Sequence, residues 1–192
     1  GFLWALLDRD AQTPFPEFEF TQLPASHVHI RASFVRCHWL QAVESVLDAA
    51  HIGFLHRDTV LRAMSATALN NATLWLQQPV PRLEFDTTRY GFREAALRAQ
   101  PDGSVNTKIR EVVQPWHVLL PGEPGFERQI VTTVPVDATH CLQFIIQLNP
   151  YKPLTQTDID RFWADAGPDP DDFGKGLPGA ETLWGQDREA MQ

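Results

Sequence analysis

The residues best suited to chemistry lie in one stretch, CHWLQAVESVLDAAHIGFLHR, residues 37–57. Asp48 and His51 are three positions apart, which places them about one turn apart on one helical face. His51 and His56 are five apart, or about 140° of rotation on a straight helix, so they converge only if the helix bends or breaks near Gly53. Two neutral imidazoles suit a first-row transition metal ion. A third ligand, a carboxylate, must come from elsewhere in the chain.

The competing interpretation is that these histidines are structural. Seven histidines in 192 residues place some pair five apart by chance. The expected burial favours a metal, because burying Asp48, His51 and His56 among apolar side chains is costly unless they are paired or bound to an ion. The apolar neighbours are Leu47, Ala49, Ala50, Ile52, Phe54 and Leu55.

The element that positions these groups is predicted to be an amphipathic helix. Its apolar stripe comprises Leu40, Val43, Leu47 and Ala50. A polar stripe, displaced by one residue along the helix, comprises Gln41, Glu44, Asp48 and His51. The preceding residues 27–37 alternate like a strand, so Val28, Ile30, Ala32 and Phe34 should share one face. Trp39 is expected to pack beneath the helix.

The rest of the chain is predicted to be rich in strands, then helical. Strand-like stretches cover residues 72–79, 82–99, 105–121, 127–137 and 140–150, and the turn signal PDGS predicts a hairpin between 90–100 and 105–114. A short helix should follow an N-cap at Thr155 or Thr157, and a last helix should begin near Thr182. This order indicates an α+β fold with helices on one side of a twisted antiparallel sheet.

The composition excludes several classes of protein. With 192 residues and 43% hydrophobic residues, the chain is expected to be one soluble globular domain. A formal net charge of −8 argues against a nucleic-acid surface. No apolar run reaches the roughly 20 residues of a membrane span. Cys37 and Cys141 form no metal or redox pair by spacing, and the default compartment is a reducing cytoplasm.

The stretch 37–57 resembles the iron-ligand segment of the Rieske non-haem iron oxygenases, the large subunits of ring-hydroxylating oxygenases, in their phthalate-dioxygenase-like branch. That family carries N-W-x-x-x-x-E/D followed by D-x-x-H-x4-H, and Asp48, His51 and His56 fit without a gap. Further similar segments, in the family's order, are GFLWALLDRDAQTPFPEFE, RYGFREAALRAQPDG, VVQPWHVLLPG, VTTVPVDATHCLQFIIQLNP and GLPGAETLWGQDREAMQ. The resemblance therefore covers nearly the whole chain.

The resemblance implies roles for individual residues. His51 and His56 would be the imidazole ligands of a mononuclear Fe(II), and Asp187 the carboxylate ligand, which leaves positions for O2 and substrate. Asp48 would be a catalytic residue that does not bind iron. It would hydrogen-bond an iron-ligating histidine and bridge toward the Rieske cluster of a neighbouring subunit. His38 stands where the family usually has Asn, and we interpret it as a local variation. Glu44 lies near a position where relatives carry a polar group.

The cysteine and histidine spacing of a Rieske [2Fe-2S] cluster is missing from this sequence. Such a cluster needs C-x-H and C-x-x-H pairs, and neither occurs. We therefore expect residues 1–24 to be a connector from a Rieske domain upstream of Gly1, and residues 25–192 to be the catalytic mononuclear-iron domain. Alone, this fragment should bind iron without turning over.

The implied fold is a helix-grip, START-like α+β domain in which a curved antiparallel sheet packs on helices. The implied function is O2-dependent hydroxylation or O-demethylation of an aromatic-type substrate, with electrons supplied by a reductase or ferredoxin through the Rieske cluster. The full-length protein should be a homotrimer. One alternative is a helix-grip module that binds an apolar ligand without metal catalysis. Another is a hydrolase that uses Zn at the same ligands.

The remaining histidines and acids receive structural interpretations. His27 and His29 are expected to face solvent, whereas His117 and His140 are expected to be polar groups at the core edge or in the pocket lining. The acidic run is expected to be a solvated face. It comprises Asp158, Asp160, Asp165, Asp169, Asp171 and Asp172.

Overall fold

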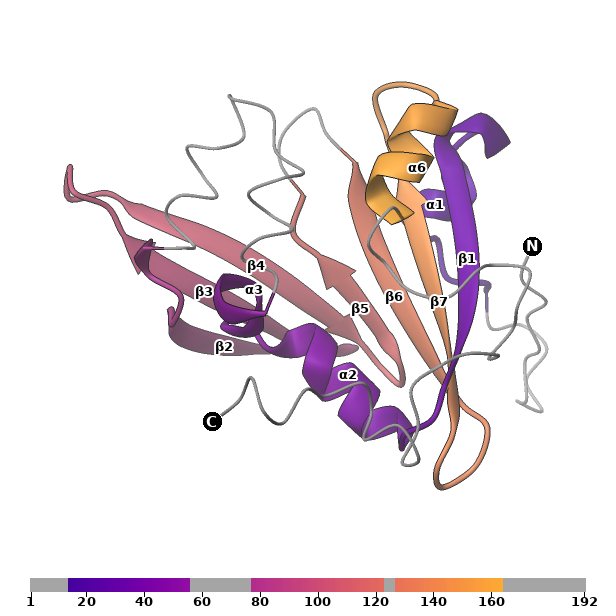
Figure 1. The fold of residues 1–192 in the computed structure, drawn as a ribbon, viewed down its shortest axis with the longest axis horizontal. Coiled ribbons are helices and arrows are strands. Elements are labelled where there is room, and N and C mark those ends of the chain that lie inside the picture. Colours follow the sequence, from indigo (N-terminus) through magenta and orange to yellow (C-terminus); the bar gives the residue numbers. More distant parts are fainter. Residues whose placement is uncertain (1–13, 56–76, 123–126, 164–192) are drawn as a thin grey trace, which may run out of the picture.

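The structure, a computed structural model, describes residues 14–55, 77–122 and 127–163. In these ranges a seven-stranded antiparallel sheet is flanked by short helices (Figure 1). The strands are β1 (Val28–Val35), β2 (Arg82–Thr88), β3 (Gly91–Ala99), β4 (Val105–Val113), β5 (His117–Leu120), β6 (Arg128–Pro135) and β7 (Cys141–Leu148). The helical segments are α1 (Glu19–Gln22), η1 (Ala25–His27), α2 (Trp39–Leu47), α3 (His51–Phe54) and α6 (Gln156–Trp163). None of the described helices is long and apolar enough to span a membrane.

The strand order is β1-β7-β6-β5-β4-β3-β2. Strands β2 to β7 form a meander in which each strand pairs with the next, and β1 joins at the far edge by pairing with β7. The helix-grip α+β class expected from the sequence, with a curved antiparallel sheet packed on helices, is confirmed. The last helix, predicted near Thr182, lies outside the described residues.

One face of the sheet is covered by the segment that precedes β1. Phe20 of α1 packs into a buried cluster with Ile130, Ile146 and Leu148. The alternation predicted for β1 is confirmed on this face, where Val28 and Ile30 pack against the cluster. The expectation of a wholly extended segment at residues 14–24 is wrong at α1, because one helical turn brings Phe20 into the core.

The opposite face carries α2, which lies across the middle of the sheet (Figure 1). Val43 packs with Val112 of β4 and Val118 of β5, and Trp39 and Leu47 pack against that cluster. Trp39 therefore lies beneath the helix as predicted. The predicted apolar stripe is wrong at Leu40, whose side chain is 45% exposed. The helix turns its Trp39 and Val43 side toward the sheet, and Leu40 is rotated out of that contact.

The β3–β4 hairpin brings charged residues onto the same face as α2. In the register, Glu94 pairs with Arg110 and Phe92 pairs with Val112, which contacts α2. Because residues two apart on a strand share a face, Arg98 and Lys108 also belong to this side. All four charged residues are buried. This half of the sheet therefore presents a polar interior to the helix side.

Two turn predictions are confirmed. PDGS closes the β3–β4 hairpin, and the Asp102 carboxylate accepts hydrogen bonds from the amide and hydroxyl of Ser104. Thr155 caps α6, because its hydroxyl accepts from the Asp158 amide while the Asp158 carboxylate accepts from the Thr155 amide. This capping box buries Asp158, so the solvated interpretation is wrong for that member of the acidic run.

The predicted strand at residues 72–79 is not borne out at its described end. Gln77 is helical, and Gln78 and Pro79 belong to no strand. The stretches 82–99 and 105–121 are each divided into two strands by turns at Arg89–Tyr90 and Gln114–Trp116. Residues 72–76 of the strand predicted at 72–79 lie outside the described residues.

Candidate functional site

Asp48 forms the junction between two helical segments. Helix α2 ends at Leu47, and Asp48 has extended backbone angles, φ −64° and ψ 104°. Its carboxylate Oδ1 accepts the Ala50 N–H at 2.8 Å, a local contact by which Asp competes with helical hydrogen bonding. The helix therefore breaks before His51. The sequence suggested a break near Gly53, and α3 ends one residue after it, at Phe54. Gly53 lies within α3.

The ring of His51 is oriented by this junction. Its Nδ1 lies 2.5 Å from the backbone carbonyl oxygen of Asp48. A carbonyl only accepts hydrogen bonds, so Nδ1 carries the proton and Nε2 carries the lone pair. This is the tautomer in which an imidazole binds a metal ion through Nε2. In this structure the Asp48 carbonyl contacts His51, and the Asp48 carboxylate contacts Ala50.

A buried ion pair lies within electrostatic reach of Asp48. Arg110 Nη1 donates to Glu94 Oε1 at 3.1 Å, and both side chains are about 5% exposed or less. Desolvation raises the pKa of Glu94 against the opposing effect of Arg110, and the negative charge of Asp48 raises it further. Desolvation lowers the pKa of Arg110, while Glu94 and then Asp48 act in the opposite direction. The three groups therefore form one electrostatic cluster.

Arg98 joins the junction to the sheet. Its Nη2 donates to the Ala49 carbonyl at 3.1 Å, and its Nε donates to the Gln78 carbonyl at 2.8 Å. Sequence reasoning missed Glu94, Arg98 and Arg110. The signal was present in Glu94 and Arg98, each two residues from the small residue Ala96, a pattern more typical of a solvated strand face.

The burial expected around the histidine pair is found at Ala49 but is wrong at Asp48, Phe54 and Leu55. Asp48 and Glu44 are exposed, and His51 is half-buried. Phe54 is 60% exposed and Leu55 78% exposed. The reason is the break at Asp48, since α3 does not continue the α2 face that packs on the sheet.

His38 is the N-cap of α2. Its Nδ1 accepts the Leu40 N–H at 3.3 Å, as an Asn side chain does at this position in many helices. His38 therefore supplies the side-chain acceptor at the start of the helix, directly before Trp39.

The proposed metal ligands are only partly described. His51 is placed as above, whereas His56 and Asp187 lie outside the described residues. Within the described ranges no group of three or more His, Cys, Asp or Glu side chains could hold a metal ion. The three-ligand site thus remains a prediction.

Three other histidines have structural partners. His117 is buried, as expected for the core edge, with Nδ1 2.9 Å from Thr132 Oγ1. The expectation that His27 and His29 face solvent is wrong, because both are half-buried. His27 Nδ1 lies 2.8 Å from the Asn149 carbonyl oxygen. Burial, and then the charge of Arg31, lower the pKa of His29.

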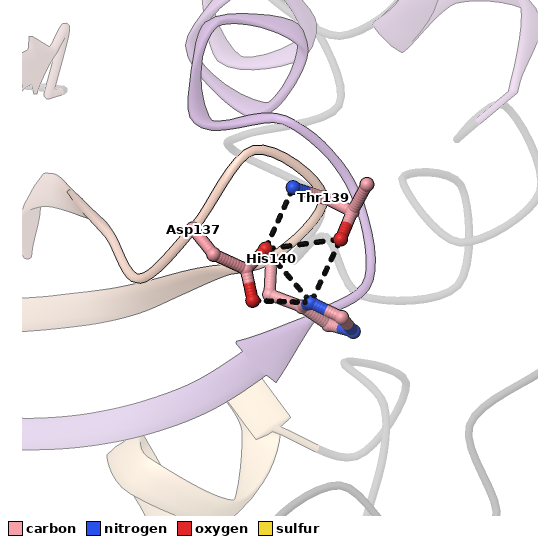
Figure 2. A network of polar contacts seen from close by, with 3 residues as sticks. All are labelled: Asp137, Thr139 and His140. Atoms are coloured by element: carbon pink, nitrogen blue, oxygen red, sulfur yellow. Dashed lines mark hydrogen bonds and ion pairs between the residues drawn. The ribbon is translucent and has the colours of Figure 1, made fainter.

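Figure 2 shows a polar network in the β6–β7 turn formed by Asp137, Thr139 and His140. His140 Nδ1 lies 3.0 Å from both carboxylate oxygens of Asp137 and 3.0 Å from Thr139 Oγ1. In a catalytic triad the acid and the nucleophile occupy opposite ring nitrogens. Here both occupy Nδ1, so the network stabilises a turn. Hydrogen bonds from the Thr139 amide and then His140 lower the pKa of Asp137 to about 2.

The fold brings together two cysteines that are distant in sequence. Cys141 pairs with Val35 in the sheet, two residues before Cys37. Burial, and then contact with the Cys37 thiol, raise the pKa of Cys141 to about 11. A thiol with a raised pKa is a poor nucleophile and metal ligand, which argues against a reactive role for Cys141.

Two surface depressions lie away from His51. One of about 490 Å³ is lined by residues of the α2 start and the β6–β7 turn, including Cys37, His38 and Thr139. Another of about 260 Å³ lies between Glu19 of α1 and residues of β4, β5 and β6. Neither includes the Asp48 junction.

Comparison with known proteins assigns the family. Residues 5–192 match the model described as "LigXa C-terminal domain like". The chain is 31% identical over 204 aligned residues to the phthalate 4,5-dioxygenase oxygenase subunit of Pseudomonas putida, with 100% of this chain covered. The chain therefore belongs to the LigXa C-terminal-domain-like family, and the resemblance to the catalytic domain of Rieske non-haem iron oxygenases is confirmed. It spans 46% of that relative's length.

Solved structures give weaker matches. The chain aligns with the quaternary ammonium Rieske monooxygenase CntA with a TM-score of 0.45 and 15% identity, covering 72% of this chain and 34% of that one. It also aligns with the di-domain aromatase/cyclase StfQ with a TM-score of 0.31 and 13% identity, covering 73% and 46%. We draw no argument from these similarities.

Proposed function

We propose that this chain is the catalytic part of a Rieske-type oxygenase that hydroxylates or O-demethylates an aromatic-type substrate. The family match over residues 5–192 carries the proposal. Residues 1–24 would connect to a Rieske domain, and residues 25–192 would form the catalytic domain. A homotrimer supplied with electrons by a cytoplasmic reductase or ferredoxin is the proposed complete assembly.

His51, His56 and Asp187 would hold a mononuclear Fe(II). When bound, such an ion with two imidazoles and one carboxylate supplies O2 activation. The described residues fit this assignment at His51, because the bond from Nδ1 to the Asp48 carbonyl leaves the lone pair on Nε2. A neutral imidazole and a carboxylate are suitable ligands for Fe(II).

Asp48 would act in electron delivery without binding the ion. Its carboxylate is exposed, so a neighbouring domain can approach it, and its backbone carbonyl contacts the proposed ligand His51. One residue thereby connects the surface to the ligand. The protein's own contribution to the reaction is to orient the ligands, position the substrate and exclude water.

Metal analysis tests the proposal. After anaerobic reconstitution with Fe(II), the wild-type chain should hold about one iron per chain, and His51→Ala and Asp187→Ala should each lose most of it. His140→Asn is the matched control, because this histidine is held in a turn and should not affect iron content.

Three outcomes would contradict the proposal. A folded wild-type chain without bound iron would favour an apolar-ligand module. Equal iron content in all variants would place the ion elsewhere. Activity that persists without O2 or reductant, with Zn bound, would indicate a hydrolase.

A further inference from the structure

Arg98 is a buried cation with two backbone partners. Its residue is 3% exposed on β3, and the carbonyls it contacts belong to Ala49 and Gln78. Ala49 is itself 2% exposed. Burial, and then the like charge of Arg110, lower the pKa of Arg98. Both effects oppose a charge at this place, so the hydrogen bonds to the carbonyls must offset a considerable cost.

The two carbonyls lie on either side of His51 in the sequence. Ala49 stands two residues before His51, and Gln78 stands four residues before the start of β2. Gln78 is also attached to β3 directly, because its Nε2 donates to the Ala99 carbonyl at 2.6 Å. A single guanidinium on β3 therefore binds both ends of the segment that contains His51.

The peptide group between Ala49 and Ala50 is held from both sides. Its oxygen accepts from Arg98 Nη2 at 3.1 Å, and its N–H donates to Asp48 Oδ1 at 2.8 Å. This peptide is separated from His51 only by Ala50, and the His51 ring contacts the Asp48 carbonyl. Fixing the peptide plane fixes the direction in which the chain enters α3, and hence the position of the His51 ring.

We propose that Arg98 is a positioning residue that clamps the base of the ligand-bearing segment to β3 and so sets the geometry of His51 for metal binding. The inference rests on the proposed function as far as the metal is concerned. Arg suits this role because its planar fork presents several N–H donors in fixed directions, whereas Lys is a point charge on a flexible stem.

The test compares Arg98→Lys and Arg98→Met with wild type in the 192-residue chain, using Co(II) as the probe ion. Both variants should bind Co(II) about 10- to 100-fold more weakly, the usual effect of removing a group that orients a metal ligand. Arg93→Lys and Arg93→Met are the matched controls on the same strand. Arg93 pairs with Glu111 at the surface, so these variants should bind as wild type does.

Amide hydrogen exchange gives a second readout. Exchange of the Ala50 and His51 amides should accelerate in the Arg98 variants more than exchange in the β3–β4 ladder. A purely structural role would instead accelerate both equally. If Arg98→Met does not fold, Arg98→Lys provides the comparison.

The inference is overturned if a folded Arg98 variant binds Co(II) within about twofold of wild type, given the larger loss expected. If wild type binds no Co(II), the proposed function fails. The exchange experiment alone then tests whether Arg98 holds the Ala49–Ala50 peptide in place. Unchanged exchange at Ala50 then overturns it.

Discussion

At the scale of single residues, the burial of charged side chains is unfavourable for the stability of the fold. Glu94 and Arg110 are paired inside the protein, next to a second buried cation, Arg98. A buried pair contributes little relative to apolar residues of the same size, but breaking it leaves one charge without compensation. The charges therefore make this part of the sheet sensitive to single substitutions.

Glu94→Gln should lower the free energy of unfolding by about 3–5 kcal/mol, because Arg110 is left as an uncompensated buried cation. Urea denaturation monitored by circular dichroism measures the change. The control is Glu111→Gln at the more exposed Arg93–Glu111 pair, where Glu111 also accepts from the Tyr90 hydroxyl, and it should cost no more than about 1 kcal/mol. Equal losses in the two variants would contradict this account of the pair.

At the scale of elements, the β2–β3–β4 hairpins depend on Gly91, the first residue of β3. Its φ is +155°, and a Cβ built there would lie 2.0 Å from the Val112 carbonyl oxygen. Real side chains cannot approach a backbone oxygen so closely. The glycine therefore allows β4 to pass close to the start of β3.

Gly91→Ala should destabilise the fold by about 2–4 kcal/mol, since the added methyl group must displace the β4 backbone as well as accept an unfavourable φ. Gly103→Ala is the comparison. Gly103 has φ +84° and nothing within 4 Å of a built Cβ, so only the conformational cost of about 1–2 kcal/mol applies. Thermal unfolding of both variants should rank Gly91→Ala as the less stable, and the reverse order would refute the steric argument.

At the scale of the whole molecule, two imidazoles whose pKa values the fold lowers make its stability depend on pH. Burial lowers the pKa of His117, and burial and then Arg31 lower the pKa of His29. In the unfolded chain both should titrate near 6.5. Below that pH the unfolded state binds protons that the folded state does not, so stability falls as the pH falls.

The free energy of unfolding should therefore decrease between about pH 6.5 and pH 5, with His117 contributing at most about 1.4 kcal/mol per pH unit. His117→Gln should show a shallower decrease over this interval, whatever its stability at pH 7.5. Urea titrations at several pH values measure the slope. A slope as steep as that of wild type would exclude His117 as a source.

The sequence predicted most of the sheet, because turn signals and alternation are local properties. The PDGS hairpin and the alternation of β1 follow from such patterns, as does the Thr155 cap. The position of the helix break did not follow, because it depends on the Asp48 carboxylate capturing the Ala50 amide. A local side-chain contact of this kind adds an interruption before His51 that the residue types alone did not indicate.

The candidate site was predictable only in part. Histidine spacing indicated His51, but the clamp at Arg98 joins residues far apart in sequence through backbone carbonyls, which have no residue-type signature. Buried polarity on β3 and β4 likewise depends on which face α2 covers. Such features become visible only once the register of the sheet is known.

The placement of β1 has a consequence for how the chain acquires its structure. Among the seven described strands β1 is synthesised first, yet its only described strand partner is β7, which is synthesised last, and Val28 pairs with Leu148. In the meander from β2 to β7 each strand can pair with the strand made just before it. β1 cannot pair until β7 has been made, and Val28 and Ile30 remain uncovered until then. Until β7 is made, the apolar side chains of β1 can contact wrong partners, so β1 is a segment on which a chaperone would act.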